Sequence, residues 1–284
     1  MHRPLIVLAA CLAAAACGGH TAAPPTASAP SAAPVAGRGD PTSVRYAAGT
    51  GRYRVEQNQH ISQEMMGQTR DVDGSTTMLV SASLSAGATG DLAAMFTVDS
   101  VEATSSLPGA ASILARMRGK VYRAVYSPQG HATSFTPPDS GDVAAGEGNV
   151  FREFLPGLPT GALTAGTAWT DTSTMNQGGA QGLTIRSQSI RQHRIAGWEL
   201  HEGVRALKIS TTTSYTITGS GEQNGQQMTV AGSGAASADQ FVSAAGVYLG
   251  ATATDSTNMI VNVVTMGMEI PVRQTRRTAV SRLP

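Results

Sequence analysis

The chain has 284 residues, of which 14% are charged, and its formal net charge is +1. No basic run or patch appears in it, and we therefore expect no nucleic-acid partner. Aromatic residues make up 5% of the chain and glycines number 32, a mixture typical of β-structure with many turns. Both cysteines, Cys11 and Cys17, lie near the N-terminus, so the rest of the chain needs a packed core instead of a disulfide.

Residues 1–16 have the layout of a secretory signal peptide. His2 and Arg3 form a charged start, an apolar run occupies residues 5–16, and small residues end it. The run is shorter than the about 20 apolar residues that a membrane-spanning helix needs. We therefore expect residues 1–16 to be removed when the chain is exported.

The small residues before each cysteine resemble the lipobox of bacterial lipoproteins, a family in which that cysteine is acylated and begins the mature chain. Leu8-Ala9-Ala10 before Cys11 fits the pattern more closely, but the apolar segment before it is shorter than the usual 7–15 residues. Cys17 has an apolar segment of workable length, so we predict lipidation at Cys17, with Cys11 as the alternative. A third interpretation is an ordinary signal peptide, which leaves Cys17 as a free thiol.

The resemblance implies a protein held in the bacterial cell envelope by fatty acyl chains. Two or three such chains are enough for stable anchoring without a membrane-spanning helix. Gly18 follows Cys17, whereas an Asp at that position tends to retain lipoproteins of double-membraned bacteria at the inner membrane. The resemblance therefore favours the outer membrane.

Residues 17–45 are predicted to form the lipidated cysteine and a disordered tether. Ala, Ser, Thr and Gly dominate this stretch and prolines interrupt it, so there is almost nothing to bury. Its root-mean-square reach is about 30 Å. Arg38-Gly39-Asp40, a tripeptide found in some adhesion ligands, is interpreted as a chance occurrence.

The folded domain is predicted over residues 46–284. Its first strand alternates clearly, because Tyr53, Val55 and Ile61 share one face with three glutamines, while charged residues occupy the other face. Further strands are expected near residues 72–84, 95–101, 121–126 and 131–135. Residues 110–119 form the best helix candidate, which Gly119 can cap.

The second half is expected to contain the same pattern of strands and turns, with longer strands. Residues 136–148 are interpreted as a loop and residues 150–155 as a helical turn. Strands are then expected at residues 182–195, 198–218, 226–237, 240–255, 257–264 and 270–280, with Gly197 as one of the breaks between them. Residues 165–169 echo residues 48–53, which favours two related halves, at about residues 46–135 and 160–284.

Long antiparallel strands with one or two short helices predict a mainly β domain. We expect a large curved antiparallel sheet or a half-open β-barrel. Tyr53-x-Val55, Gly166-Thr167-Ala168-Trp169 and the strand after Ala238-Asp239-Gln240-Phe241 resemble features of uncharacterised bacterial lipoproteins with β-meander domains. More distantly, the layout is similar to the half-barrel lipoprotein and lipid carriers of bacterial envelopes. That resemblance implies a curved sheet around an apolar cavity closed by short helices.

Motifs that carry chemistry are sparse. His201-Glu202 begins like a zinc motif, but Arg205 occupies the position of the second histidine, so no metal site is predicted. Serines flanked by glycines occur at Ser220 and Ser233, and we place both in turns between strands. Asp71 and Asp73 flank a predicted turn, where solvated carboxylates are expected in preference to a cation site. No cofactor is predicted.

The methionines are a more informative set, since flexible thioethers suit adaptable apolar pockets as well as gaps in a core that is poor in aromatics. The chain has 11 of them. We expect a non-enzymatic protein, anchored to a membrane, that binds an apolar ligand or acylated partner on a curved sheet. The alternatives are a structural or protein-interaction module of the envelope with a filled core, and a hydrolase with dispersed catalytic residues.

Overall fold

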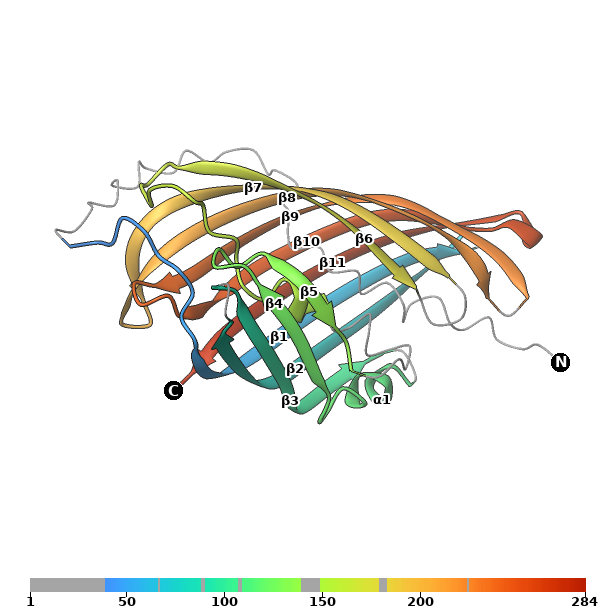
Figure 1. Cartoon of the computed structure of the whole chain (residues 1–284). Coiled ribbons are helices and arrows are strands. Elements are labelled where there is room, and N and C mark those ends of the chain that lie inside the picture. The colour runs from blue at the N-terminus through green and yellow to red at the C-terminus, as the bar shows by residue number, and fades with distance from the viewer. Residues whose placement is uncertain are drawn as a thin grey trace.

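The computed structural model describes residues 39–65, 67–87, 90–106, 109–138, 149–178, 183–223 and 225–284. These residues form one antiparallel sheet of 11 strands with little helix (Figure 1). The strands are β1 (Gly49–Met65), β2 (Gln68–Ala86), β3 (Leu92–Ser105), β4 (Val121–Tyr126), β5 (Ala132–Thr136), β6 (Ala168–Gly178), β7 (Thr184–His201), β8 (Val204–Gln223), β9 (Gln226–Ser243), β10 (Tyr248–Val263) and β11 (Met268–Leu283). The helices are α1 (Ala110–Ala115), α3 (Asn149–Arg152) and the 3-10 turn η2 (Val264–Met266).

The sheet consists of two meanders joined side by side. Its spatial order is β5-β4-β3-β2-β1-β11-β10-β9-β8-β7-β6, so β1 and β11 pair across the join, with Val55 opposite Val280 and Gln59 opposite Arg276. β5 and β6 are the two edges, and the sheet is not closed between them. The predicted large curved antiparallel sheet is therefore confirmed.

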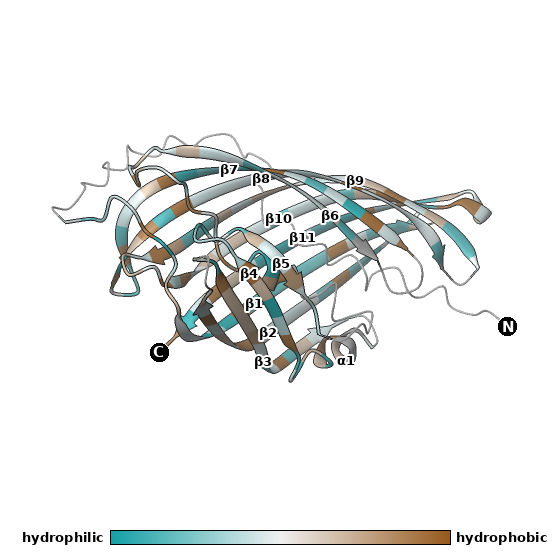
Figure 2. Ribbon diagram, viewed as in Figure 1, coloured by the Kyte–Doolittle hydropathy of each residue, from teal (hydrophilic) through white to brown (hydrophobic). Residues whose placement is uncertain are grey.

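Side chains alternate between a buried and an exposed face along nearly every strand. On β10, Thr257, Met259 and Val261 are buried, whereas Asn258 and Ile260 between them are exposed. We call the buried side the inner face and the other side the outer face. The outer face is dominated by Ser, Thr, Asn and charged residues, and hydrophilic and hydrophobic residues alternate along the strands in Figure 2. Successive side chains of a strand point to opposite faces, so each strand contributes only every second residue to the core of the inner face.

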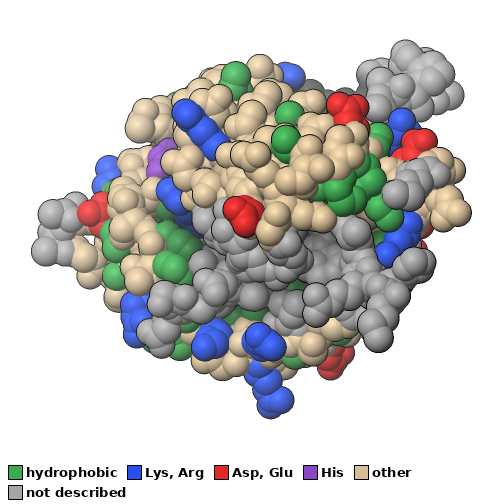
Figure 3. Space-filling model, turned by 90° about the vertical axis from the view of Figure 1, so that its right-hand side faces the viewer, with side chains coloured by type: hydrophobic (Ala, Val, Ile, Leu, Met, Phe, Trp, Pro, Cys, Tyr) green, Lys and Arg blue, Asp and Glu red, His purple; other side chains and the backbone are tan. Residues whose placement is uncertain are grey.

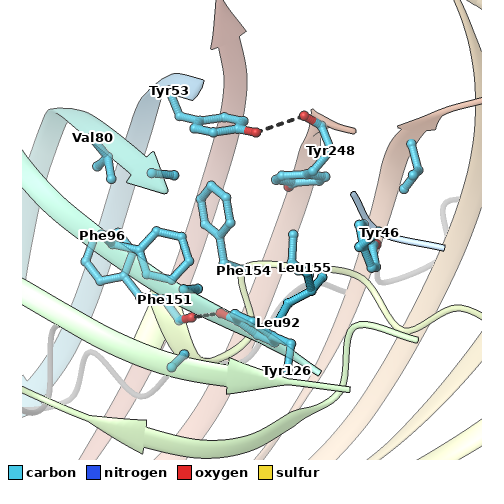
Figure 4. Packing of buried hydrophobic residues seen from close by; sticks show 14 of the residues in the cluster. Tyr46, Tyr53, Val80, Leu92, Phe96, Tyr126, Phe151, Phe154, Leu155 and Tyr248 are labelled. Carbon is cyan, nitrogen blue, oxygen red and sulfur yellow. Dashed lines mark hydrogen bonds between the residues drawn. The ribbon is translucent and has the colours of Figure 1, made fainter. Parts of the chain in front are cut away.

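Cluster one is the larger apolar cluster of the inner face, and it is filled by a chain segment that crosses it. This crossing segment, residues 149–163, connects the two meanders and contributes Phe151, Phe154, Leu155, Leu158 and Leu163 to the cluster. The Phe154 ring lies edge-on to Tyr53, with centroids 4.9 Å apart (Figure 4).

Two tyrosine hydroxyls tie the crossing segment to the sheet and to the residues just before β1. Tyr126 Oη donates to the carbonyl of Phe151, and Tyr46 Oη donates to that of Pro156 over 2.7 Å. The segment is thus held by hydrogen bonds as well as by aromatic packing.

Cluster two occupies the opposite end of the inner face and is built differently. Its buried members are Ile61, Val72, Ile185, Tyr215, Ile217, Met228, Val230, Met259, Val261, Val263, Ile270 and Val272. All of them lie on strands of the sheet, and within the described residues no helix or crossing segment contributes a buried member.

The residues just before β1 lie against the sheet. Val44 and Tyr46 are buried in cluster one, and Arg205 donates two hydrogen bonds to the Asp40 carboxylate, at 3.0 and 2.7 Å. The predicted signal peptide, Cys17 and its alternative Cys11 lie outside the described residues. Among the described residues, no helix has the length and apolar character needed to cross a membrane.

The predicted short helices are present in reduced form. α1 ends at Ala115, and turns then lead to Gly119, whose φ is 76°, while Met117 between them is buried. The predicted helical turn at residues 150–155 coincides in part with α3. Most of the predicted loop at residues 136–148 lies outside the described residues.

Several predicted strand boundaries are wrong, including the breaks after residues 237 and 255, which fall inside β9 and β10. Gly197 does not end a strand but sits at a bulge inside β7, and the chain reverses at Glu202-Gly203, where φ is 49° and 81°. The predicted strand at residues 240–255 runs through a real turn, since β9 ends at Ser243 and β10 begins at Tyr248. These errors have one cause, because polar or glycine residues inside long strands carry the same local signal as residues that break a strand.

Candidate ligand-binding face

A band of buried polar side chains separates the two apolar clusters on the inner face. We call it the polar belt, and its buried members are Ser189, His193, Thr211, Thr213, Asp255, Thr257, Gln274 and Arg276. The order along single strands shows the layering. On β8, Ile209 belongs to cluster one, Thr211 and Thr213 to the belt, and Ile217 to cluster two.

Asp255 is the centre of the strongest contacts in the belt. Arg276 Nη2 donates to its Oδ2 over 2.9 Å, and Tyr215 Oη donates to its Oδ1 over 2.7 Å. Thr257 Oγ1 lies 2.5 Å from Tyr215 Oη and completes the network. Asp255 and Arg276 are 7% and 9% exposed, so this is a buried ion pair with its hydrogen bonds satisfied.

The electrostatics of the network follow from its burial. Burial raises the pKa of the Asp255 carboxyl above its ordinary value, and the Arg276 guanidinium opposes that shift. Burial, followed by the nearby Asp255 charge, raises the pKa of the Tyr215 hydroxyl well above its ordinary value. Tyr215 is therefore a neutral hydrogen-bond donor at any physiological pH.

Gly234 makes this network geometrically possible. Tyr215 on β8 pairs with Gly234 on β9, and β10 comes next, so the tyrosine side chain crosses a whole strand to reach Asp255. A Cβ atom built on Gly234 would lie 2.6 Å from Tyr215 Cε2. The glycine thus leaves the space in which the aromatic ring lies.

A second set of polar groups surrounds His193 on β7. Its Nδ1 lies 2.9 Å from Thr211 Oγ1, its Nε2 lies 3.2 Å from Asp171 Oδ2, and its ring stacks on Trp169 with centroids 5.0 Å apart. Asp171 also has His131 as a neighbour, at 3.8 Å. Burial lowers the pKa of His193, and the Asp171 charge opposes that shift. Neutral imidazole is therefore favoured at neutral pH.

This arrangement contains the charges of an acid–base site but no serine placed to act with them among the described residues. The Ser189 hydroxyl is bonded to Ser173 over 2.7 Å instead of to an imidazole. In the same described part of the chain, no group of three or more His, Cys, Asp or Glu side chains is arranged to hold a metal ion.

His60, His201 and the two serines singled out from the sequence lie at separate places on the sheet. His60 lies on the outer face with its Nδ1 2.8 Å from Asp73 Oδ1 and its Nε2 3.9 Å from Asp71 Oδ1. The two carboxylates do not flank a turn as predicted, since both lie inside β2. His201 stacks on Phe241 with centroids 3.8 Å apart. Ser220 and Ser233 do not lie in turns as predicted, since they are inside β8 and β9. The glycines next to them are tolerated because these strands are long and paired on both sides.

The outer face carries two shallow hollows where the sheet twists. The larger has a volume of about 890 Å³ and is lined by His60, Asp73, Arg277 and several Ser and Thr residues. The smaller, of about 420 Å³, lies next to it and is lined by Glu56, Asn58 and residues of β8 to β11. Both are open, and most of the side chains that line them are Ser, Thr, Asn or charged residues.

Cluster two contains more methionine side chains than cluster one. Met228 and Met259 are buried in it, and Met65 and Met268 pack against its edge. Thioether side chains can adapt to a ligand of variable shape. The sequence pointed to the methionines but not to Asp255. Asp255 could have been found because it lies on the same face of its strand as Met259 and Val261.

Comparisons with known proteins do not assign the chain. No protein-family profile and no curated protein matches it. Among solved structures, the translocator domain of autotransporter NalP from Neisseria meningitidis is similar at 10% sequence identity, with 83% of this chain and 89% of that chain covered. The TM-score is 0.19, a likeness too small to carry an argument about fold or function.

Proposed function

We propose that this protein is a lipid-anchored, non-enzymatic component of the bacterial cell envelope that holds an apolar ligand on the inner face of its curved sheet. The ligand class is a lipid or the acyl chain of a modified partner, and the site is cluster two. The anchor is Cys17, and the absence of an acidic residue at Gly18 favours the outer membrane.

The observation that carries the proposal is the contrast between the two apolar clusters. Cluster one is filled by aromatic side chains of the crossing segment, whereas among the described residues the buried members of cluster two all come from the strands themselves. An apolar concave surface lined by aliphatic and thioether groups can take up a flexible apolar ligand. The polar belt then bounds the site on one side.

Paired overpacking variants test whether cluster two has room. Val261 in cluster two and Val80 in cluster one are both fully buried. We expect Val80→Phe to cost about 1–3 kcal/mol of unfolding free energy, because it enlarges a side chain in a filled core. Val261→Phe should cost less and should lower the binding of a fluorescent fatty-acid probe to the full chain.

Two direct measurements accompany the variants. Organic extraction of the purified full chain should release lipid, and mass spectrometry of the N-terminal peptide should find acyl chains on Cys17. Equal destabilisation by Val80→Phe and Val261→Phe, with no lipid released and no probe bound, would reject the ligand-binding part. An unmodified Cys17 thiol would reject the anchor.

A second candidate is a structural or protein-interaction module of the envelope. The filling of cluster one by Phe151, Phe154 and Leu158 favours it, because it shows that part of the inner face is an ordinary core. If Val261→Phe is as costly as Val80→Phe, cluster two is also a filled core, and this candidate replaces the first.

A further inference from the structure

The tip of the β10–β11 hairpin presents apolar side chains to its surroundings. Val264 and Met266 of the η2 turn are 51% and 42% exposed, and Ile260 on the outer face of β10 is 44% exposed. These are three of the exposed large apolar side chains of the described chain, gathered in one hairpin. Figure 1 shows this hairpin at the right-hand end of the sheet, and Figure 2 shows hydrophobic residues at its tip.

The composition of this hairpin differs from that of the adjacent β8–β9 hairpin at the same end. No charged residue occurs between Asp255 and Glu269. The tip of the adjacent β8–β9 hairpin, by contrast, carries Glu222, Gln226 and Gln227. Met266 has one contact within the fold, because Gln226 Nε2 lies 3.3 Å from its Sδ, yet its side chain and that of Val264 remain largely exposed. Exposed apolar side chains gathered in one place are typical of a contact surface.

The apolar tip is continuous with cluster two. Met268 directly follows the turn and packs against cluster two together with Met65 from the neighbouring hairpin. Figure 3 views the molecule from this end and shows apolar side chains at its surface. Whatever the tip contacts is therefore brought next to the proposed ligand site.

We propose that the tip formed by Val264 and Met266 inserts into the surface of a lipid bilayer. The inference rests on the proposed function, which places the chain on a membrane and an apolar ligand in cluster two. A lipid surface is favoured over a protein groove because the tip is a convex turn without charged residues to fix a register. The acyl region of a bilayer can bury an apolar tip without a surface of complementary shape. Glu269, which is exposed just behind the tip, limits the depth of insertion to the interface.

Fluorescence quenching tests the contact directly. The anchored full chain is reconstituted in phosphatidylcholine vesicles, with or without bromine on the acyl chains, in three variants: Met266→Trp, Gln227→Trp and Ala244→Trp. Gln227 lies at the neighbouring hairpin and Ala244 at the β9–β10 turn, and both are exposed. The native Trp169 and Trp198 give the same background in all variants, and the parent chain measures it.

We expect brominated lipid to quench the added tryptophan at position 266 at least twofold more than the one at position 227, and not to quench the one at position 244. Equal quenching at all three positions would overturn the inference. So would a lipid-independent blue shift at position 266 in a chain that is dimeric, because the tip would then be covered by a second copy. If Met266→Trp does not fold by far-ultraviolet circular dichroism, Val264→Trp is measured in its place.

The outcomes separate this inference from the proposed function. Quenching at position 266 with no lipid in the organic extract keeps the inserted tip and rejects the ligand. Lipid in the extract without quenching keeps the ligand and rejects the inserted tip.

Discussion

Replacing Gly234 by alanine is expected to break the network at the centre of the polar belt. The backbone of Gly234 is an ordinary extended strand without a positive φ, so alanine meets no backbone strain there. Its methyl group, however, would occupy the space of the Tyr215 ring, 2.6 Å from Cε2. The ring must move, and its hydroxyl then loses the 2.7 Å hydrogen bond to Asp255.

The magnitude follows from three contributions. A hydrogen bond to a charged carboxylate contributes about 1.5–3 kcal/mol, and overpacking a tight site costs about 1–3 kcal/mol. Alanine recovers about 0.4–1 kcal/mol by restricting the unfolded chain. We therefore expect Gly234→Ala to lower the free energy of unfolding by about 2–5 kcal/mol, measured by urea unfolding of the full chain. Ser233→Ala, on the outer face of the same strand, is the matched control and should change it by less than about 0.5 kcal/mol.

A double-mutant cycle identifies the cause. In a Tyr215→Leu background the aromatic ring no longer covers Gly234, so the added methyl group should cost less than about 1 kcal/mol. A Gly234→Ala cost that is the same with and without Tyr215 would refute the reasoning, because the loss would then come from another contact of strand β9.

Three further predictions concern the belt and the crossing segment. Arg276→Gln should cost about 3–5 kcal/mol in urea unfolding, because it leaves the Asp255 charge buried without a counter-charge; the loss should shrink on acidification as Asp255 takes up a proton, and a pH-independent loss would contradict this. Phe154→Ala should cost about 3–5 kcal/mol through the cavity it leaves in cluster one, and a small change in thermal midpoint would argue that the crossing segment does not fill the core. Because the folded-state pKa of His193 is lowered, its contribution to stability is complete above the ordinary pKa of 6.5 and is lost as the pH falls through the folded-state pKa. His193→Gln should therefore flatten the decline in unfolding free energy from pH 7 to pH 5. An unchanged slope would exclude this histidine as its source.

The fold class could be predicted from the sequence because alternation is a local signal. The parity of Tyr53, Val55 and Ile61 on β1 requires no knowledge of the partner strands, and the structure buries all three. Turn positions were harder where the residues were unusual. The real turn is at Glu202-Gly203, where Glu202 adopts a left-handed φ of 49°. Glutamate seldom has this role, so the sequence favoured a turn at Gly197 instead.

The belt could not be predicted, because its contacts depend on strand register. Asp255 and Arg276 meet only because they are direct partners in the β10–β11 ladder, and Asp171 reaches His193 from the neighbouring strand β6. A strand boundary placed after residue 255 also hid the parity that assigns Asp255 to the inner face. A correct turn at residues 244–247 would have revealed a charged residue at a buried position, which is a signal for a partner.

The buried network also bears on how this sheet specifies its own register. Strand β9 is built largely of Gly, Ala and Ser between Val230 and Ala238, and such a sequence distinguishes its two faces poorly. A slip of one residue would move few large side chains on β9, but it would place a methyl or hydroxymethyl group under the Tyr215 ring in place of Gly234. It would also shift Tyr215 on β8 relative to Asp255 on β10, since both strands pair with β9. The buried contacts among Tyr215, Asp255 and Arg276 therefore favour one register of β9 between β8 and β10, which the small side chains of β9 cannot specify by themselves.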